Sequence, residues 1–256
     1  MARFEKLEFE QQSTSPTITT RTSKATDPEW RLQAIEERRC GNYEQSLRMY
    51  SRALEDDKSL VDCWLGQVQM LVLLDECVEA ELWSRKALEL FPGNGDLMSG
   101  RAQAMRRMGD TGQALVLSDG SLKAAGQSAY RWMVRGELMA ATKQDTDRHC
   151  FDKAVLADKD WLVLLEIACI YLELGLPSRA LDRIRSAVQL APDRYHAWYI
   201  QGRTEHQLGL REAAKASWEH CVGICPGHDN ANGALQKFEQ GQSAVQRWWR
   251  HIFGGA

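Results

Sequence analysis

The chain has 256 residues, of which 44% are hydrophobic and 26% are charged, as is typical of a globular protein. Its formal net charge of −3 at pH 7 excludes a global electrostatic attraction to nucleic acid, so no nucleic-acid partner is expected. No stretch is long and apolar enough to predict a membrane-spanning helix.

The first segment, residues 1–26, has no helical period. Residues 1–12 carry Glu and Lys and lack the apolar run of a secretory signal, and residues 11–26 are rich in Ser and Thr. A polar segment of this kind buries too little apolar surface to fold alone. We therefore expect residues 1–26 to form a flexible Ser/Thr-rich leader.

A regular tryptophan spacing begins after this leader. Trp30, Trp64, Trp132 and Trp198 are separated by 34, 68 and 66 residues, which are one period, two periods, and two periods less two residues. Self-similarity at a period near 34 indicates stacked helical hairpins. We predict six units at residues 27–60, 61–94, 95–128, 129–160, 161–194 and 195–228.

The units share small and aromatic residues at fixed places. Unit 61–94 has Trp64, Ala80, Ala87 and Pro92 at its fourth, twentieth, twenty-seventh and thirty-second places. Small residues let two helices approach closely, and proline after the second helix ends it. This pattern resembles the tetratricopeptide repeat, whose first helix carries Trp, Leu-Gly and Tyr and whose second carries Ala, an aromatic residue and a late Pro.

The resemblance implies an all-α fold, a right-handed α-α superhelix of about six helix-turn-helix repeats. The sequence departs from the family pattern at the seventh place of the repeat, where Leu is usual but five units have Gln or Arg. These residues are Gln33, Gln67, Arg101, Arg135 and Gln201.

The resemblance also implies a binding surface, because the first helix of each hairpin lines the concave face in this family. The second, fifth, ninth and twelfth places of those helices predict a groove that contacts a partner. Its predicted residues are Leu65, Gln69, Gln103, Arg106, Tyr130, Met133, Glu137, Leu162, Leu165, Cys169, Tyr199 and Arg203.

Two features of this face leave alternatives open. Its central and later part is apolar, which is typical of a partner site, but neighbouring helices or the C-terminal segment would also explain it by covering these residues. An arginine cluster in units 95–128 and 129–160 is either a solvated helix face or a patch for an acidic ligand. Its members are Arg101, Arg106, Arg107, Arg131 and Arg135.

The sequence offers little chemistry for catalysis. We find no nucleophile motif, phosphate-binding loop or zinc-protease motif, so we predict a protein that is not an enzyme and has no cofactor. Seven cysteines without a Cys-x-x-Cys motif favour a reducing compartment, and we predict a cytoplasmic protein. His220, Cys221, Cys225 and His228 come nearest to a metal site, but the repeat register explains Cys221 as packing, so no metal is expected.

The last segment, residues 229–256, has two apolar stripes. Ala231, Leu235 and Phe238 predict a helix that caps the last repeat. A second stripe has the i, i+3, i+4, i+7, i+8 spacing of one helix face, with basic residues beside it. Its residues are Val245, Trp248, Trp249, Ile252 and Phe253.

Three interpretations of this second stripe remain open. It extends the cap, it docks into a partner or another copy of the chain, or it lies on a membrane surface, which so short a helix disfavours. The sequence as a whole predicts a non-catalytic protein-interaction scaffold that binds a peptide or helix of a partner protein in its groove. The alternative is a membrane-associated or self-assembling assembly factor that works through the Trp248–Trp249 helix.

Overall fold

The computed structural model describes residues 27–240, and every regular element in this range is a helix. The predicted all-α class, built from repeated helical hairpins, is confirmed. The chain divides into two compact units, Met1–Leu138 and Met139–Ala256, called unit 1 and unit 2 below. The division falls inside one helix, α7 (Ala129–Ala141), and each unit is treated by itself.

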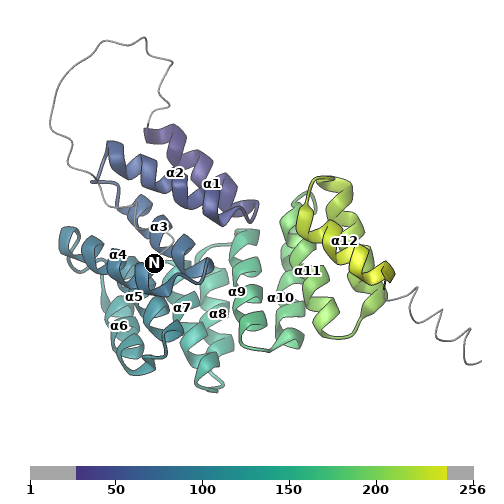
Figure 1. The fold of residues 1–256 in the computed structure, drawn as a ribbon. Helices are drawn as coiled ribbons and strands as arrows, with labels where there is room; N and C mark the ends of the chain where they lie inside the picture. The colour runs from purple at the N-terminus through teal and green to yellow at the C-terminus, as the bar shows by residue number, and fades with distance from the viewer. Residues whose placement is uncertain (1–26, 241–256) are drawn as a thin grey trace, which may run out of the picture. The chain divides into compact units, whose positions relative to one another are not determined.

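Unit 1 holds three complete hairpins, and in each of them two consecutive helices fold back on one another (Figure 1). Each hairpin lies within one of the 34-residue units that the sequence predicts. The helices are α1 (Asp27–Arg39), α2 (Tyr43–Asp56), α3 (Val61–Leu73), α4 (Cys77–Leu90), α5 (Gly95–Arg107) and α6 (Thr111–Lys123).

Unit 2 continues the same pattern, with α9, α10 and α11 side by side in Figure 1. Its helices after α7 are α8 (Asp147–Ala157), α9 (Trp161–Glu173), α10 (Pro177–Leu190), α11 (Tyr195–Gln207) and α12 (Arg211–Ile224). A further helix covers residues 229–240.

The turn inside each hairpin needs a left-handed residue at the same place in the repeat. The fifteenth residue of every predicted unit has a positive φ, between 56° and 94°. Glycine adopts this conformation without steric penalty, and it stands there in four of the six units. The six residues are Gly41, Asp75, Gly109, Lys143, Gly175 and Gly209.

The hairpins pack through the small residues that the sequence marks. Ala80 and Ala180 have no exposed surface, and at Gly202 an added Cβ would overlap the indole of Trp218 in α12. Large side chains fill the spaces beside them, as where the Trp64 and Trp83 rings lie 5.9 Å apart. Interdigitation of small and large residues gives the close packing of a protein interior.

The unusual residues at the seventh place are also accommodated. Arg101 in α5 pairs with Glu81 in α4 at 2.8 Å, and Arg135 in α7 pairs with Asp119 in α6 at 2.7 Å. Each guanidinium therefore reaches the second helix of the preceding hairpin. An ion pair between neighbouring hairpins thus replaces the leucine packing that the family favours at this place.

The helix at residues 229–240 covers the last hairpin. Ala231 is fully buried and Phe238 is 6% exposed, while Leu235 is partly exposed, so the predicted stripe faces the protein. The Arg211 guanidinium of α12 lies 5.1 Å from the centre of the Phe238 ring. Most of the other side chains of this helix are polar and exposed. A polar outer face is what ends a stack of repeats.

Candidate functional site

The ninth place of the repeat is where the predicted groove can be followed from hairpin to hairpin. It holds Gln69, Gln103 and Glu137 in unit 1, and Cys169 and Arg203 in unit 2. Within each unit these residues are one repeat apart, and stacking of the hairpins brings Gln103 and Glu137 of unit 1 into contact. Whether neighbouring side chains can bond to each other then decides whether they are buried or remain exposed to solvent.

In unit 1 these side chains bond to other protein groups. The Gln69 amide oxygen of α3 accepts a hydrogen bond from the Arg38 guanidinium at 2.6 Å. The Gln103 amide nitrogen of α5 donates to the Glu137 carboxylate at 2.5 Å, and its amide oxygen accepts from the Tyr130 hydroxyl at 2.8 Å. All three of these side-chain hydrogen bonds join residues of unit 1. A partner would find the donors and acceptors of Gln103 already engaged.

Glu137 is the charged centre of this group. Its side chain is 1% exposed, and it forms an ion pair with the Arg106 guanidinium. The Arg107 guanidinium lies 3.6 Å away and donates a hydrogen bond to the Val72 carbonyl at 3.1 Å. A buried carboxylate needs such partners, since an unpaired buried charge is strongly destabilising. The group of Gln103, Arg106, Arg107, Tyr130 and Glu137 is called the Glu137 network below.

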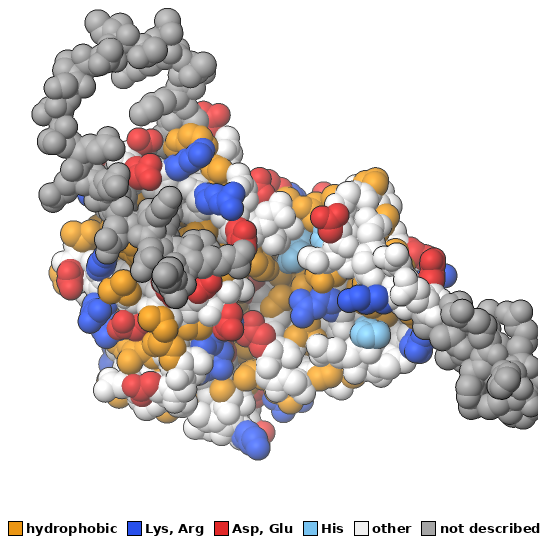
Figure 2. Space-filling model, viewed as in Figure 1, with side chains coloured by type: hydrophobic (Ala, Val, Ile, Leu, Met, Phe, Trp, Pro, Cys, Tyr) orange, Lys and Arg blue, Asp and Glu red, His pale blue; other side chains and the backbone are white. Residues whose placement is uncertain are grey.

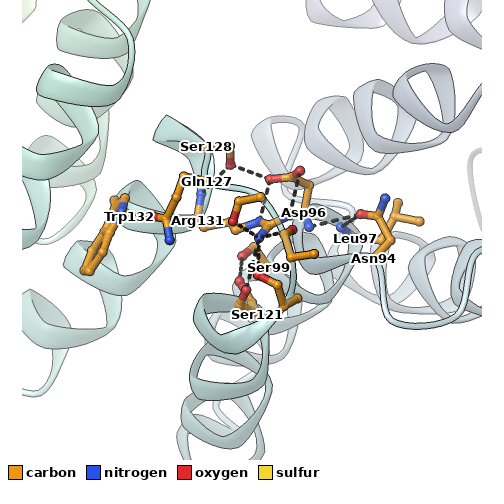
Figure 3. Close-up of polar contacts among 12 residues, drawn as sticks. Asn94, Asp96, Leu97, Ser99, Ser121, Gln127, Ser128, Arg131 and Trp132 are labelled. Carbon is orange, nitrogen blue, oxygen red and sulfur yellow. Dashed lines mark hydrogen bonds and ion pairs between the residues drawn. The ribbon is translucent and has the colours of Figure 1, made fainter.

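Arg131 of α7 forms a second internal site, drawn in Figure 3. Its guanidinium pairs with the Asp96 carboxylate at 3.2 Å and donates to backbone carbonyls after α6, including those of Ala125 at 3.0 Å and Gly126 at 2.9 Å. The Ser128 hydroxyl also donates to Asp96. Arg131 therefore joins the start of α5, the end of α6 and the start of α7.

The arginine cluster of the sequence thus has a structural explanation. Arg101, Arg106, Arg107, Arg131 and Arg135 each lie within ion-pair distance of a carboxylate in unit 1. These contacts account for the positive charges without a bound acidic ligand. They also differ from a fully solvated face, because every one of these side chains is buried or partly buried.

Unit 2 presents a different surface on α9 and α11. Leu162 and Cys169 of α9 are partly exposed, whereas Leu165 between them has no exposed surface. On α11, Tyr199 is partly exposed and Arg203 is exposed. The Arg203 guanidinium lies 5.9 Å from the centre of the Tyr199 ring, within the range of a cation–π contact. Leu162, Cys169, Tyr199 and Arg203 are called the α9–α11 face below.

Histidine rings support this face from behind. The His228 ring lies 4.8 Å from the Tyr199 ring and 5.5 Å from the Tyr195 ring. Its Nδ1 accepts a hydrogen bond from the Ala231 amide at 3.1 Å, so His228 also caps the helix at residues 229–240. The 34-residue spacing gives no signal for this arrangement, because it depends on the loop after α12.

Burial keeps the two buried or half-buried imidazoles of this cluster neutral. Desolvation, with smaller contributions from His228 and Arg203, lowers the pKa of His196 to about 3. Desolvation also lowers the pKa of His228 below its ordinary value. Near pH 7 the fixed positive charge at this face therefore belongs to Arg203.

A third internal carboxylate lies elsewhere in unit 2. Asp147 at the start of α8 has no exposed surface, and it accepts hydrogen bonds from the Tyr171 hydroxyl at 2.9 Å and the Arg179 guanidinium at 2.7 Å. Burial and the Asp147 hydrogen bond raise the pKa of Tyr171 above its ordinary range. This group ties α8 to α9 and α10.

The structure separates the twelve predicted groove residues by exposure. Six are buried: Gln69, Gln103, Tyr130, Met133, Glu137 and Leu165. Six reach solvent at least in part: Leu65, Arg106, Leu162, Cys169, Tyr199 and Arg203. At the six buried positions the structure favours the alternative that neighbouring parts of the protein cover the predicted groove residues. The binding roles of all twelve stay a prediction.

Other candidate sites of the sequence can be placed as well. Within residues 27–240, no group of three or more His, Cys, Asp or Glu side chains is arranged to hold a metal ion. Cys221 is fully buried, and none of the seven cysteines, all of which lie within the described residues, forms a disulfide. No helix between residues 27 and 240 is long and apolar enough to cross a membrane. The stripe of Val245, Trp248, Trp249, Ile252 and Phe253 lies outside the described residues, as does the predicted leader 1–26.

Comparisons with known proteins agree with the repeat. Residues 165–217, which run from α9 to α12, match the family model of the tetratricopeptide repeat. A thermophilic tetratricopeptide repeat protein from Thermus thermophilus has a TM-score of 0.54 at 16% identity, over 72% of this chain and 99% of that one. No curated protein matches the sequence.

Two further solved structures have the same fold. A tetratricopeptide repeat protein from Parabacteroides merdae has a TM-score of 0.51 at 15% identity, covering 83% of this chain and 84% of that one. The APC/C hetero-tetramer Cut9–Hcn1 gives 0.51 at 14% identity, where the match covers 83% of this chain but 43% of that one. Identities this low show the fold and carry nothing about the ligand.

Proposed function

We propose that this chain, which has the fold of tetratricopeptide repeat proteins, is a non-catalytic scaffold that binds a peptide or helix of a partner protein on the α9–α11 face of unit 2. Stacked helical repeats of this kind provide surfaces for holding other proteins. The proposal concerns unit 2 alone and assigns no binding role to the Glu137 network.

One observation carries the choice of face. At the ninth place of the repeat, Gln103 and Glu137 are buried and bonded to each other, whereas Arg203 is exposed. Tyr199 stands partly exposed beside Arg203. An aromatic ring next to an arginine is typical of the residues that contribute most to protein interfaces. The exposed side chains of unit 2 are therefore better suited to a partner than the internally bonded ones of unit 1.

A non-catalytic role is consistent with the carboxylates of the described chain. Glu137, Asp147 and Glu205 are all buried, and each accepts hydrogen bonds from neighbouring side chains. They hold helices together in this arrangement. The alternative function, an assembly factor working through the Trp248–Trp249 helix, depends on residues outside the described range, so no structural observation favours it.

The test is site-specific photo-crosslinking in a lysate of the source cell. A benzoylphenylalanine at Tyr199 keeps an aromatic ring on α11, and the matched control carries the same residue at Leu190, which is 60% exposed at the end of α10. We expect a discrete crosslinked partner from position 199 and none from position 190. Equal crosslinking at both positions, or crosslinking at 190 alone, would contradict the assignment of the face.

A further inference from the structure

The charge of the α9–α11 face is unbalanced. Arg203 forms no ion pair with a carboxylate among the described residues, and His206 is exposed one turn further along α11. The acidic residue of this helix, Glu205, is buried, where it accepts from the Ser217 hydroxyl at 2.6 Å and the Gln201 amide at 3.1 Å. No carboxylate of α11 therefore neutralises Arg203.

Unit 1 shows what this chain does with arginines that are buried or partly buried. Arg106, Arg131 and Arg135 each meet a carboxylate from a neighbouring helix. Arg203 differs because it is exposed and has no ion-paired carboxylate among the described residues, and Cys169, the ninth-place residue of the preceding repeat, carries no carboxylate. A guanidinium presents several hydrogen-bond donors in a fixed plane that matches a carboxylate. A carboxylate of a bound ligand could therefore form the ion pair that Arg203 lacks.

An aromatic side chain beside Arg203 is held in position. Tyr199 lies under the guanidinium, and the His228 ring packs against it at 4.8 Å. Leu162 of α9 adds a partly exposed aliphatic side chain, directly before the buried Val163 and Leu164. A ligand must therefore combine one carboxylate with an adjacent apolar side chain.

We propose that the α9–α11 face binds an acidic segment of a partner protein, with an Asp or Glu carboxylate on Arg203 and a neighbouring apolar side chain on Tyr199 and Leu162. This inference rests on the proposed function and names the partner chemistry of the same face. The chain's own C-terminal stripe does not fit the description, because Arg247, Arg250 and His251 stand among its apolar residues. Its basic side chains would meet Arg203 with like charge.

The experiment selects short random peptides from a display library on the full-length protein. Two variants serve as parallel baits: Arg203→Glu, and Arg185→Glu, which makes the same charge change at an exposed residue of α10. Circular dichroism and thermal unfolding establish that all three proteins are folded alike. An enriched peptide is then synthesised and its affinity measured by fluorescence anisotropy at low and high salt.

We expect the unaltered protein to enrich peptides in which Asp or Glu adjoins a large apolar residue. Arg203→Glu should lower the affinity for the synthetic peptide by at least about tenfold and remove the salt dependence of binding. Arg185→Glu should leave the affinity unchanged. A peptide of residues 241–256 should not displace it. Enriched peptides without acidic preference, equal binding to Arg203→Glu, or displacement by residues 241–256 would overturn this inference and leave the proposed function standing. Failure of all three baits to enrich any peptide would overturn the proposed function itself.

Discussion

The same place in the repeat is used in opposite ways by the two compact units. In unit 1 the ninth place carries Gln103 and Glu137, which hydrogen-bond to each other at 2.5 Å below the surface. In unit 2 it carries Cys169, which is partly exposed, and Arg203, which is exposed. The difference lies in whether side chains one repeat apart complement each other. Where they do, the hairpins close against one another, and where they do not, a charged group stays available to a partner.

Counter-charges separate the Glu137 network from the α9–α11 face in the same way. Arg106 and Arg107 approach one carboxylate, Glu137, which is 1% exposed. Arg203 instead lies over a tyrosine ring and has no ion-paired carboxylate among the described residues. The arginines of the Glu137 network therefore stabilise the fold, and we expect substitutions in this network to change stability first.

Glu137→Ala tests the stabilising side of the comparison and has the largest expected effect. Removing the carboxylate leaves the partly buried Arg106 and Arg107 guanidiniums without their counter-charge and the Gln103 amide without its acceptor, so we expect the free energy of unfolding to fall by about 4 kcal/mol. Urea unfolding followed by circular dichroism measures this. Asp119→Ala is the matched control, because it breaks the Arg135 pair at a carboxylate side chain that is 53% exposed. That pair should contribute less than about 1 kcal/mol, and equal losses for both variants would contradict the assignment of Glu137 as a buried charged centre.

Two leucines on α9 test where the proposed binding face ends and the core begins. Leu165 is fully buried and Leu162 is partly exposed, although both occupy predicted groove places. We expect Leu165→Ala to lower the free energy of unfolding by about 3 kcal/mol through the lost burial and the cavity, and Leu162→Ala by less than about 1 kcal/mol. Peptide binding should show the reverse order: Leu162→Ala should lower the affinity more than Leu165→Ala, when both proteins are folded. A destabilised Leu162→Ala protein with full affinity would exclude Leu162 from the face.

These leucines also show what the sequence could and could not predict. The 34-residue period predicted the hairpins, because backbone geometry repeats with the chain, as the left-handed residue at the fifteenth place of every unit also illustrates. The period did not predict that Leu165 is buried and Leu162 partly exposed, since the register gives the helix face of a residue and not what covers that face. The Gln103–Glu137 bond was predictable in principle from their spacing of one repeat. The packing of His228 on Tyr199 was not, because it depends on a loop that lies outside the helical period.

The last prediction concerns acid, and it tests whether the rings behind Arg203 form a packed support. An unfolded histidine binds a proton near pH 6.5, but burial lowers the pKa of His196 to about 3 in the folded protein. Between these values the unfolded state binds more protons, so stability rises with pH and is lost as the pH falls from 6.5 toward 3. From pH 7 to pH 5 this one group should lower the free energy of unfolding by about 2 kcal/mol.

His196→Phe should remove most of that acid-dependent loss, because the ring packing remains while the ionisable group is gone. The groups that face it, His228, Tyr199 and Arg203, are unchanged in this variant. His149→Phe, at an exposed histidine of α8, is the matched control and should keep the slope of the unaltered protein. Urea unfolding at pH 7 and pH 5 for the three proteins measures the difference. If His196→Phe loses as much stability on acidification as the unaltered chain, then His196 is not buried as a neutral ring, and the support beneath Tyr199 and Arg203 must be more open than its packing indicates.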